Sequence, residues 1–192
     1  MSFLGLYEKY KKLCPTYILY LGCLVTAFAI KLFYTNADSF SLQFILAPVT
    51  RLVEVFTGTL YHFVQERGYM SSDVTVEIGP SCAGINFLVI LFCAFSFSFI
   101  KEFNGIIKVL AAVLFLILSY IITIIVNTFR IVAAINFTVY NDAYLKIDKE
   151  DFHKILGTLV YFFFLVLFYM AISRLVIFLK TRKSRGMPKT TL

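Results

Sequence analysis

Hydrophobic residues gather in four long runs along the chain, separated by short polar connections. Each run is close to the roughly 20 apolar residues that a helix needs to cross a bilayer core of about 30 Å. These predicted crossings are residues 16–34, 82–100, 106–126 and 156–179. The pattern predicts an all-α fold, a polytopic transmembrane helical bundle that forms a single integral membrane domain over residues 1–192.

Residues 42–64 form a fifth apolar segment, which is interrupted by Pro48, Arg51, Glu54 and Gly58. Proline and charged side chains weaken a membrane-spanning helix, whereas an amphipathic helix at the membrane surface tolerates them. The segment fits an interfacial helix, a re-entrant segment or an additional crossing, and the pattern does not choose among the three.

Residues 69–79 show a different period. Val74, Val76 and Ile78 alternate with polar residues, as β-branched positions do in a half-buried strand. We expect a short extracytoplasmic β-strand or hairpin here, directly before the second predicted crossing.

Composition supports the membrane assignment. Hydrophobic residues make up 60% of the chain and charged residues 15%, against about 45–50% and about 25% in soluble domains. Basic residues outnumber acidic ones by 18 to 11 and crowd residues 180–192, directly after the last run. Because that tail has no aromatic residue to stack on a base, we expect no nucleic-acid partner. We interpret it as a basic cytoplasmic tail beside anionic lipid headgroups.

Lysines set the expected orientation. They precede the first run and flank the connection between the second and third runs at Lys101 and Lys108, and positive residues favour the cytoplasmic side. Asp142 and Glu150 help to make the loop before the last run acidic, which suits the outer side. We expect a multi-pass protein of the cytoplasmic membrane with both termini inside, or with the N-terminus outside if residues 42–64 cross.

Three of the four cysteines are interpreted as structural. Cys14, Cys23 and Cys93 lie in or beside apolar runs, where a thiol acts as a small hydrophobic group. No Cys-x-x-Cys or paired-histidine spacing occurs, so we expect no metal site. Glycine-rich phosphate-binding loops are missing as well, and we expect no cofactor.

Cys82 differs because it stands at the outer mouth of a predicted membrane helix. Pro80 and Ser81 precede it, Gly84 follows it, and Asn86 is expected on the same helix face. The positive end of a helix favours a thiolate, which is the nucleophilic form of cysteine. We interpret Cys82 as a candidate nucleophile, with a buried structural thiol as the alternative.

Two further residues stand out at the same membrane depth. Arg130 is the only charge in residues 121–137; it faces a cavity or a partner, or it snorkels to the interface. Asn127 lies three residues earlier, on the same helix face. His153 opens the last helix after the acidic loop and can exchange protons near neutral pH. The predicted topology brings Cys82, Arg130 and His153 to the outer side of the membrane.

A nucleophile, a fixed cation and a proton-transfer group are what acyl transfer through a thioester requires. We therefore interpret the chain as a membrane-embedded cysteine protease or transpeptidase. The main alternative is a non-enzymatic helical membrane scaffold or transporter component, in which the same residues line a polar path or brace helices. A membrane acyltransferase that loads Cys82 with a lipid acyl group is a second alternative.

Four short motifs occur in order along the chain. They are Leu46-Ala47-Pro48-Val49, Gly79-Pro80-Ser81-Cys82-Ala83-Gly84-Ile85-Asn86, Asn127-Thr128-Phe129-Arg130-Ile131, and His153 ahead of Gly157. Together they resemble the exosortase/archaeosortase family of polytopic membrane cysteine transpeptidases, and the compact length resembles its K-type branch. The chain departs from the family in having Ala83 where serine is common, and in having fewer predicted crossings than many members.

The resemblance implies cleavage of C-terminal sorting signals of exported proteins through a Cys82 thioester. The implied catalytic residues are Cys82, Arg130 and His153. The implied supporting residues are Asn127, Asn86, Ser81 and Gly84. The implied partners are an exported protein with a signal motif, a membrane helix and a basic tail, together with an acceptor in the cell envelope and the membrane lipids. The acceptor is water, a lipid amine or a sugar hydroxyl, and the sequence does not choose among them.

Overall fold

The computed structural model describes residues 3–72, 75–103, 105–140 and 149–185, and side chains within residues 16–72, 75–103, 105–137 and 154–178 and at residue 181. The acidic loop before the last run and most of the basic tail lie outside the described residues. In chain order the elements are α1 (Phe3–Asn36), α2 (Gln43–Thr57), β1 (Tyr61–Val64), β2 (Gly68–Ser71), β3 (Glu77–Ile78), η1 (Pro80–Cys82), α3 (Ile85–Phe99), η2 (Ile100–Glu102), α4 (Ile107–Tyr140) and α5 (Lys149–Arg185). The predicted all-α bundle with a short β segment is confirmed.

Four of the described helical segments are long and apolar enough to cross a membrane. They are Thr16–Asn36, Pro80–Glu102, Ile107–Phe137 and Lys154–Phe178. Each overlaps one of the four predicted crossings, but the third continues well past its predicted end at residue 126. It does so because apolar residues continue on most of the helix surface, interrupted by few polar side chains. The chain is a multi-pass membrane protein.

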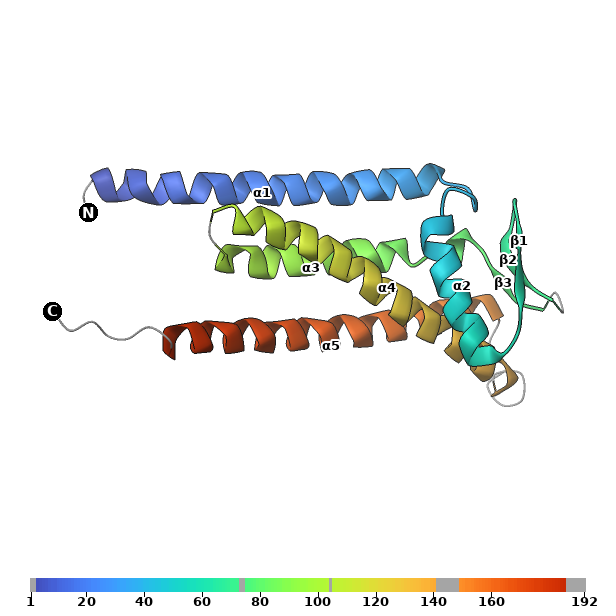
Figure 1. Cartoon of the computed structure of the whole chain (residues 1–192). Coiled ribbons are helices and arrows are strands. Elements are labelled where there is room, and N and C mark those ends of the chain that lie inside the picture. The colour runs from blue at the N-terminus through green and yellow to red at the C-terminus, as the bar shows by residue number, and fades with distance from the viewer. Residues whose placement is uncertain (1–2, 73–74, 104, 141–148, 186–192) are drawn as a thin grey trace.

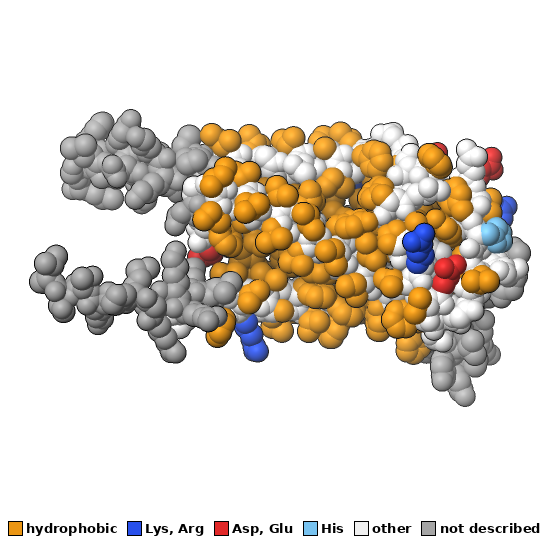
Figure 2. Space-filling view, viewed as in Figure 1, with side chains coloured by type: hydrophobic (Ala, Val, Ile, Leu, Met, Phe, Trp, Pro, Cys, Tyr) orange, Lys and Arg blue, Asp and Glu red, His pale blue; other side chains and the backbone are white. Residues whose placement is uncertain are grey.

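The spans form a bundle around α3 (Figure 1). In this view α1 and α5 run along opposite sides of the α3–α4 pair, and α4 crosses the bundle obliquely. Of the membrane-crossing segments, that of α3 is 61% buried and that of α5 only 6%. The Phe95 ring holds α3 against α4, because it packs against Phe115 with ring centroids 6.0 Å apart. Figure 2 shows hydrophobic side chains over the middle of the bundle, where lipid would cover them.

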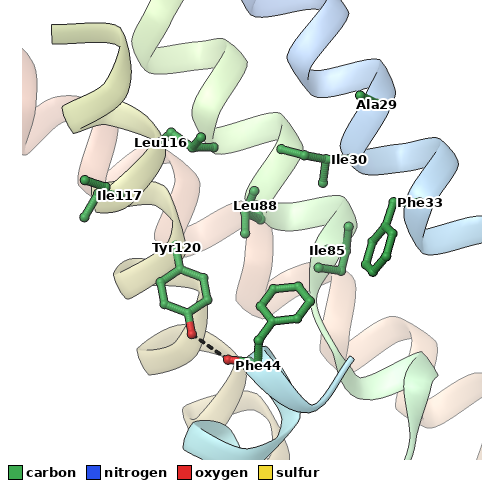
Figure 3. Close-up of a pocket in the computed structure, with 9 residues that line it drawn as sticks. All are labelled: Ala29, Ile30, Phe33, Phe44, Ile85, Leu88, Leu116, Ile117 and Tyr120. Atoms are coloured by element: carbon green, nitrogen blue, oxygen red, sulfur yellow. Dashed lines mark hydrogen bonds between the residues drawn. The ribbon is translucent and has the colours of Figure 1, made fainter. Parts of the chain in front are cut away.

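α2 lies across one end of the bundle (Figure 1). Its 15 residues span about 22 Å at 1.5 Å per residue, which is shorter than a bilayer core of about 30 Å. Pro48 lies inside α2 and lacks the N–H that would bond to the carbonyl of Phe44. The Tyr120 hydroxyl of α4 donates to that carbonyl instead, at 2.5 Å (Figure 3). α2 is therefore fixed to α4, and it is not among the described segments that are long and apolar enough to cross a membrane.

A three-stranded antiparallel sheet in the order β1-β2-β3 follows α2. The β2–β3 pair, in which Tyr69 lies opposite Ile78, is the hairpin expected within residues 69–79, although Val74 lies outside the described residues. The strand β1 was not predicted. Gly68 permits the close pairing, because a Cβ there would stand 2.6 Å from the carbonyl oxygen of Ile78. The sheet therefore fixes the strand that leads directly into the turn at Cys82.

Candidate active site

Cys82 ends a short 3₁₀ turn that connects β3 to α3. Its N–H donates to the Gly79 carbonyl at 2.9 Å, and the next N–H, that of Ala83, donates to Pro80 at 3.0 Å. Gly84 then adopts a left-handed conformation with φ +70°, and α3 begins after it. The expectation that Cys82 lies in the first turn of the membrane helix is wrong, because Gly84 interrupts the helical path. Cys82 lies on a separate turn, in which its own N–H and that of Ala83 are already paired.

Asn127 of α4 holds this turn from the side. Its side chain is completely buried, and its Nδ2 donates to the backbone carbonyl of Cys82. Its Oδ1 accepts from the hydroxyl of Tyr161 on α5, at 2.8 Å. Gly84 lets the helices approach, because a Cβ there would lie 3.3 Å from both Asn127 Cγ and the Tyr161 hydroxyl. Asn127 thus links the Cys82 turn to α5.

Arg130 lies one turn farther along α4 and is only 8% exposed. Its Nη1 donates to the Tyr161 hydroxyl at 3.2 Å, and its guanidinium carbon stands 5.3 Å from the centre of the Tyr161 ring. Its Nε is buried without a hydrogen-bond partner among the described residues. Gly157 of α5 lies against it, since a Cβ at that glycine would be 2.7 Å from Nε. Arg130 is therefore directed inward, and the snorkelling alternative does not describe it.

A polar cavity of about 290 Å³ opens beside these residues. It is lined by Tyr34, Ser81, Gly84, Ile85, Asn86, Arg130, Lys154, Gly157, Thr158 and Tyr161. Cys82 lies between Ser81 and Gly84 in the turn and is 7% exposed. Its Sγ lies 4.0 Å from Ser81 Oγ. Among the residues that the structure describes, the lining carries the guanidinium of Arg130 and no carboxylate, so the cavity suits a group that carries or develops negative charge.

α1 supports the Cys82 turn from the other side. The Tyr34 hydroxyl donates to the Pro80 carbonyl at 3.2 Å. Asn86, which was expected to share a face with Cys82, is exposed and accepts from Lys31 Nζ at 2.5 Å. Asn86 therefore joins α1 to α3 at the rim of the cavity.

His153 lies in α5, and its side chain is outside the described side chains. Its helical position is four residues before Gly157, and so one turn from the glycine that packs against Arg130. Among the described residues, no group of three His, Cys, Asp or Glu side chains is placed to hold a metal ion. Cys23, Cys82 and Cys93 are free thiols.

A second cavity of about 480 Å³ lies between α1, α2, α3 and α4, and its lining carries no charged side chain (Figure 3). Ile85 lines both this apolar cavity and the polar one. Tyr120 and Phe44 close one side of it through their hydrogen bond. The two cavities are therefore neighbours that differ sharply in polarity.

Comparison with known proteins identifies the family. The sequence model described as transmembrane exosortase matches residues 9–170. The chain belongs to the transmembrane exosortase family. Comparisons with curated proteins and with solved structures give no match. Membership gives this exosortase a membrane transpeptidase-type role in which exported proteins are the substrates.

The structure also adds residues to the candidate site that the sequence did not single out. Tyr161 joins Arg130 to Asn127, and Lys31 reaches Asn86 from α1. A spacing signal for Tyr161 was present, because it lies four residues after Gly157, and two positions four apart share a helix face. No such signal existed for Lys31, since its contact depends on how α1 packs against α3.

Proposed function

We propose that this exosortase is a membrane-embedded cysteine transpeptidase that cleaves C-terminal sorting signals of exported proteins through a thioester on Cys82. One observation carries the proposal: the Cys82 turn and Arg130 are joined by consecutive hydrogen bonds through Asn127 and Tyr161 at a cationic cavity. An arginine buried within a membrane-spanning helix is costly to insert, and such residues mark functional sites. A merely structural thiol would not need this arrangement beside it.

In the first step, the Cys82 thiolate attacks the carbonyl carbon of the scissile peptide bond, and a C–S bond forms. The carbonyl oxygen becomes an oxyanion, which the Arg130 guanidinium stabilises by charge and by N–H donation. The C–N bond then breaks, and the leaving amine takes a proton from protonated His153. The sorting peptide departs, and the rest of the substrate stays on Cys82 as a thioester.

In the second step, an acceptor attacks the thioester carbon. Water, an amine or a hydroxyl can supply the nucleophilic atom, and neutral His153 takes the proton that this atom loses. The C–S bond breaks, which restores the Cys82 thiolate and protonated His153. The cycle is therefore balanced without a metal, a cofactor or a redox partner.

The cavity geometry supports these roles for the residues described. Arg130 lines the cavity and bonds to Tyr161 through Nη1, so its fixed positive charge lies beside an oxyanion that forms there. Asn127 engages the backbone carbonyl of Cys82 and so fixes the turn that carries the thiol. Ser81 and Gly84, the neighbours of Cys82 in the same turn, line the cavity, although Cys82 itself is not among its lining residues. A substrate backbone can therefore approach the turn from the cavity.

We also propose that the site faces the extracytoplasmic side of the cytoplasmic membrane. The Cys82 turn, α2 and the sheet share one end of the bundle (Figure 1). The α3–α4 connection lies at the opposite end, with exposed Lys101 and with Lys108 nearby, and lysines favour the cytoplasmic side. An exported substrate would then meet the thiol after its translocation.

Replacing Cys82 with alanine tests the function. In cells that make an exported protein with a C-terminal hydrophobic anchor, we expect Cys82→Ala to abolish cleavage, so that the uncleaved precursor accumulates. The precursor is followed by immunoblotting and mass spectrometry, with the amount of enzyme in the membrane unchanged. Cys93→Ala, which removes another thiol eleven residues along the chain, is the matched control and should process normally. Unchanged processing in Cys82→Ala would refute the proposal and favour a scaffold or transporter component.

A further inference from the structure

The hydroxyl of Tyr161 makes two of the hydrogen bonds that join the Cys82 turn to Arg130. It donates to Asn127 Oδ1 at 2.8 Å and accepts from Arg130 Nη1 at 3.2 Å. A tyrosine hydroxyl has one proton to donate, so these two bonds fix which partner receives it. The arginine can only donate, and the amide oxygen can only accept. The direction of this hydrogen-bond chain is therefore set by the chemistry of its members.

The Tyr161 ring is held independently of its hydroxyl. It stacks on Phe87 of α3, with ring centroids 4.8 Å apart and planes 14° apart. The Arg130 guanidinium carbon stands 5.3 Å from the ring centre, at a distance that gives a cation–π attraction. Because phenylalanine would keep both ring contacts, the hydroxyl can be removed without removing the packing.

Two glycines bring the ring and the hydroxyl to this place. Gly157 lies one turn before Tyr161 on α5, and a Cβ on this glycine would stand 2.7 Å from Arg130 Nε. Gly84, in the Cys82 turn, would carry a Cβ 3.3 Å from the Tyr161 hydroxyl. The hydroxyl is therefore enclosed by the two elements that carry the thiol and the guanidinium.

Removing the hydroxyl would leave two polar groups unsatisfied. Asn127 is completely buried and Arg130 is 8% exposed, and a polar group that loses its partner in such surroundings tends to move to a new one. Asn127 binds the Cys82 carbonyl, so a shift of its amide would move the turn. A shift of Arg130 would move the cation away from where the oxyanion forms.

We propose that Tyr161 is a positioning residue for the Cys82 reaction: its hydroxyl fixes the Arg130 guanidinium relative to the Cys82 turn through Asn127. This inference rests on the proposed function, because it concerns the rate of the thioester-forming step. Tyr161 does not itself exchange a proton with the substrate in this scheme. Its effect on the reaction passes entirely through Arg130 and Asn127.

The test compares Tyr161→Phe with Tyr120→Phe. Each change deletes one hydroxyl that bonds across helices, but the Tyr120 hydroxyl bonds to the Phe44 carbonyl on α2. The substrate is the precursor that accumulates in Cys82→Ala cells, and the enzyme is the full chain in proteoliposomes. We expect Tyr161→Phe to lower kcat by about 10- to 100-fold, as small misplacements of catalytic groups do, with KM within about twofold because ground-state binding is kept. Tyr120→Phe should keep the wild-type kcat.

A double-variant cycle separates positioning from general stability. If Tyr161 acts through Arg130, then adding Tyr161→Phe to Arg130→Lys should change kcat by less than about twofold. The inference would be overturned if the fold-losses in kcat of the two single variants multiplied in the double variant, because the two residues would then act independently. A wild-type kcat in Tyr161→Phe would also overturn it, as would failure of that variant to accumulate in the membrane, which would show that the hydroxyl serves folding.

The controls distinguish this inference from the function on which it rests. Cys82→Ala without activity together with Tyr161→Phe at the wild-type rate would refute the positioning role alone. Processing that continues in Cys82→Ala would refute the function itself.

Discussion

Arg130 is held on several sides by groups from α5. Its Nη1 bonds to the Tyr161 hydroxyl, its guanidinium stands near the ring of the same tyrosine, and Gly157 lies against its Nε. An arginine that only balanced charge at the membrane surface would reach water through its long side chain. Here the side chain is enclosed, so the position of the guanidinium is set by packing against one helix.

Gly157 gives a direct test of that packing. An alanine Cβ at this position would stand 2.7 Å from Arg130 Nε and 3.2 Å from its Cζ, so the guanidinium must shift. A displacement of about 1 Å can cost about 100-fold in rate, and we expect Gly157→Ala to slow precursor processing by at least about tenfold. Processing rates in proteoliposomes are the measurement.

Gly22→Ala is the matched control for this change. It places the same methyl group in α1, where nothing lies within 4 Å of the new Cβ, and alanine favours a helix over glycine. We expect wild-type processing from it. Equal rates in the two alanine variants would show that the contact between α5 and Arg130 has no role in the reaction.

The sequence predicted the residues with unusual chemistry better than it predicted their neighbours. Cys82 and Arg130 could be singled out because a thiol beside Pro80 and a lone charge in an apolar run are exceptions to the pattern around them. Tyr161 was not singled out, because it is one of 12 tyrosines and its spacing from Gly157 does not show which neighbour that helix face meets. Which face of an aromatic helix meets its neighbour depends on packing, and the hydrophobic pattern alone does not set that register.

Among the elements, the membrane helices were the most predictable, because the length of an apolar run directly reflects the bilayer thickness. The end of α4 was less predictable, since the helix continues past residue 126 into a part of the chain that carries Arg130. The predicted boundary fell short because apolar residues continue past residue 126 around a few polar side chains, Arg130 among them. Arg130 lies about 35 Å along the axis of α4 from Ile107, the first residue of that helix. This distance places it close to the outer limit of the bilayer core.

The segment of residues 42–64 was ambiguous for an identifiable reason. Pro48 argues against a helix interior, but its missing hydrogen bond is replaced from another element, because Tyr120 donates to the Phe44 carbonyl. A compensation that comes from α4 leaves no trace in the local sequence. The strand β1 was missed similarly, since its four residues continue an apolar segment and become a strand by pairing with β2.

For the whole molecule, the distribution of polar groups defines two ends. The Cys82 turn, α2 and the sheet lie at one end of the bundle, and the α3–α4 connection lies at the other (Figure 1). Near this second end, Lys108 Nζ donates to Thr16 Oγ1 at 2.6 Å and so ties α4 to α1. The positive-inside rule then predicts that the second end is cytoplasmic.

Thiol labelling tests this orientation. In a variant whose native cysteines are replaced by alanine, Gln65→Cys introduces a thiol at an exposed residue between β1 and β2, and Thr181→Cys introduces one at an exposed residue near the end of α5. A membrane-impermeant maleimide should label Gln65→Cys in intact cells and Thr181→Cys only after permeabilisation. The opposite labelling pattern would place the Cys82 turn on the cytoplasmic side, away from the exported part of a substrate.

The most direct measurement looks for the thioester itself. Purified enzyme is mixed with the precursor that accumulates in Cys82→Ala cells, the reaction is quenched in acid within the first turnover, and the peptide containing Cys82 is analysed by mass spectrometry. The predicted result is a substrate-derived acyl group on Cys82 that hydroxylamine removes and that Arg130→Lys strongly reduces. The account would be contradicted if the wild-type enzyme cleaved the precursor while Cys82 stayed unmodified at every time point, and if Cys82→Ala cleaved it equally fast.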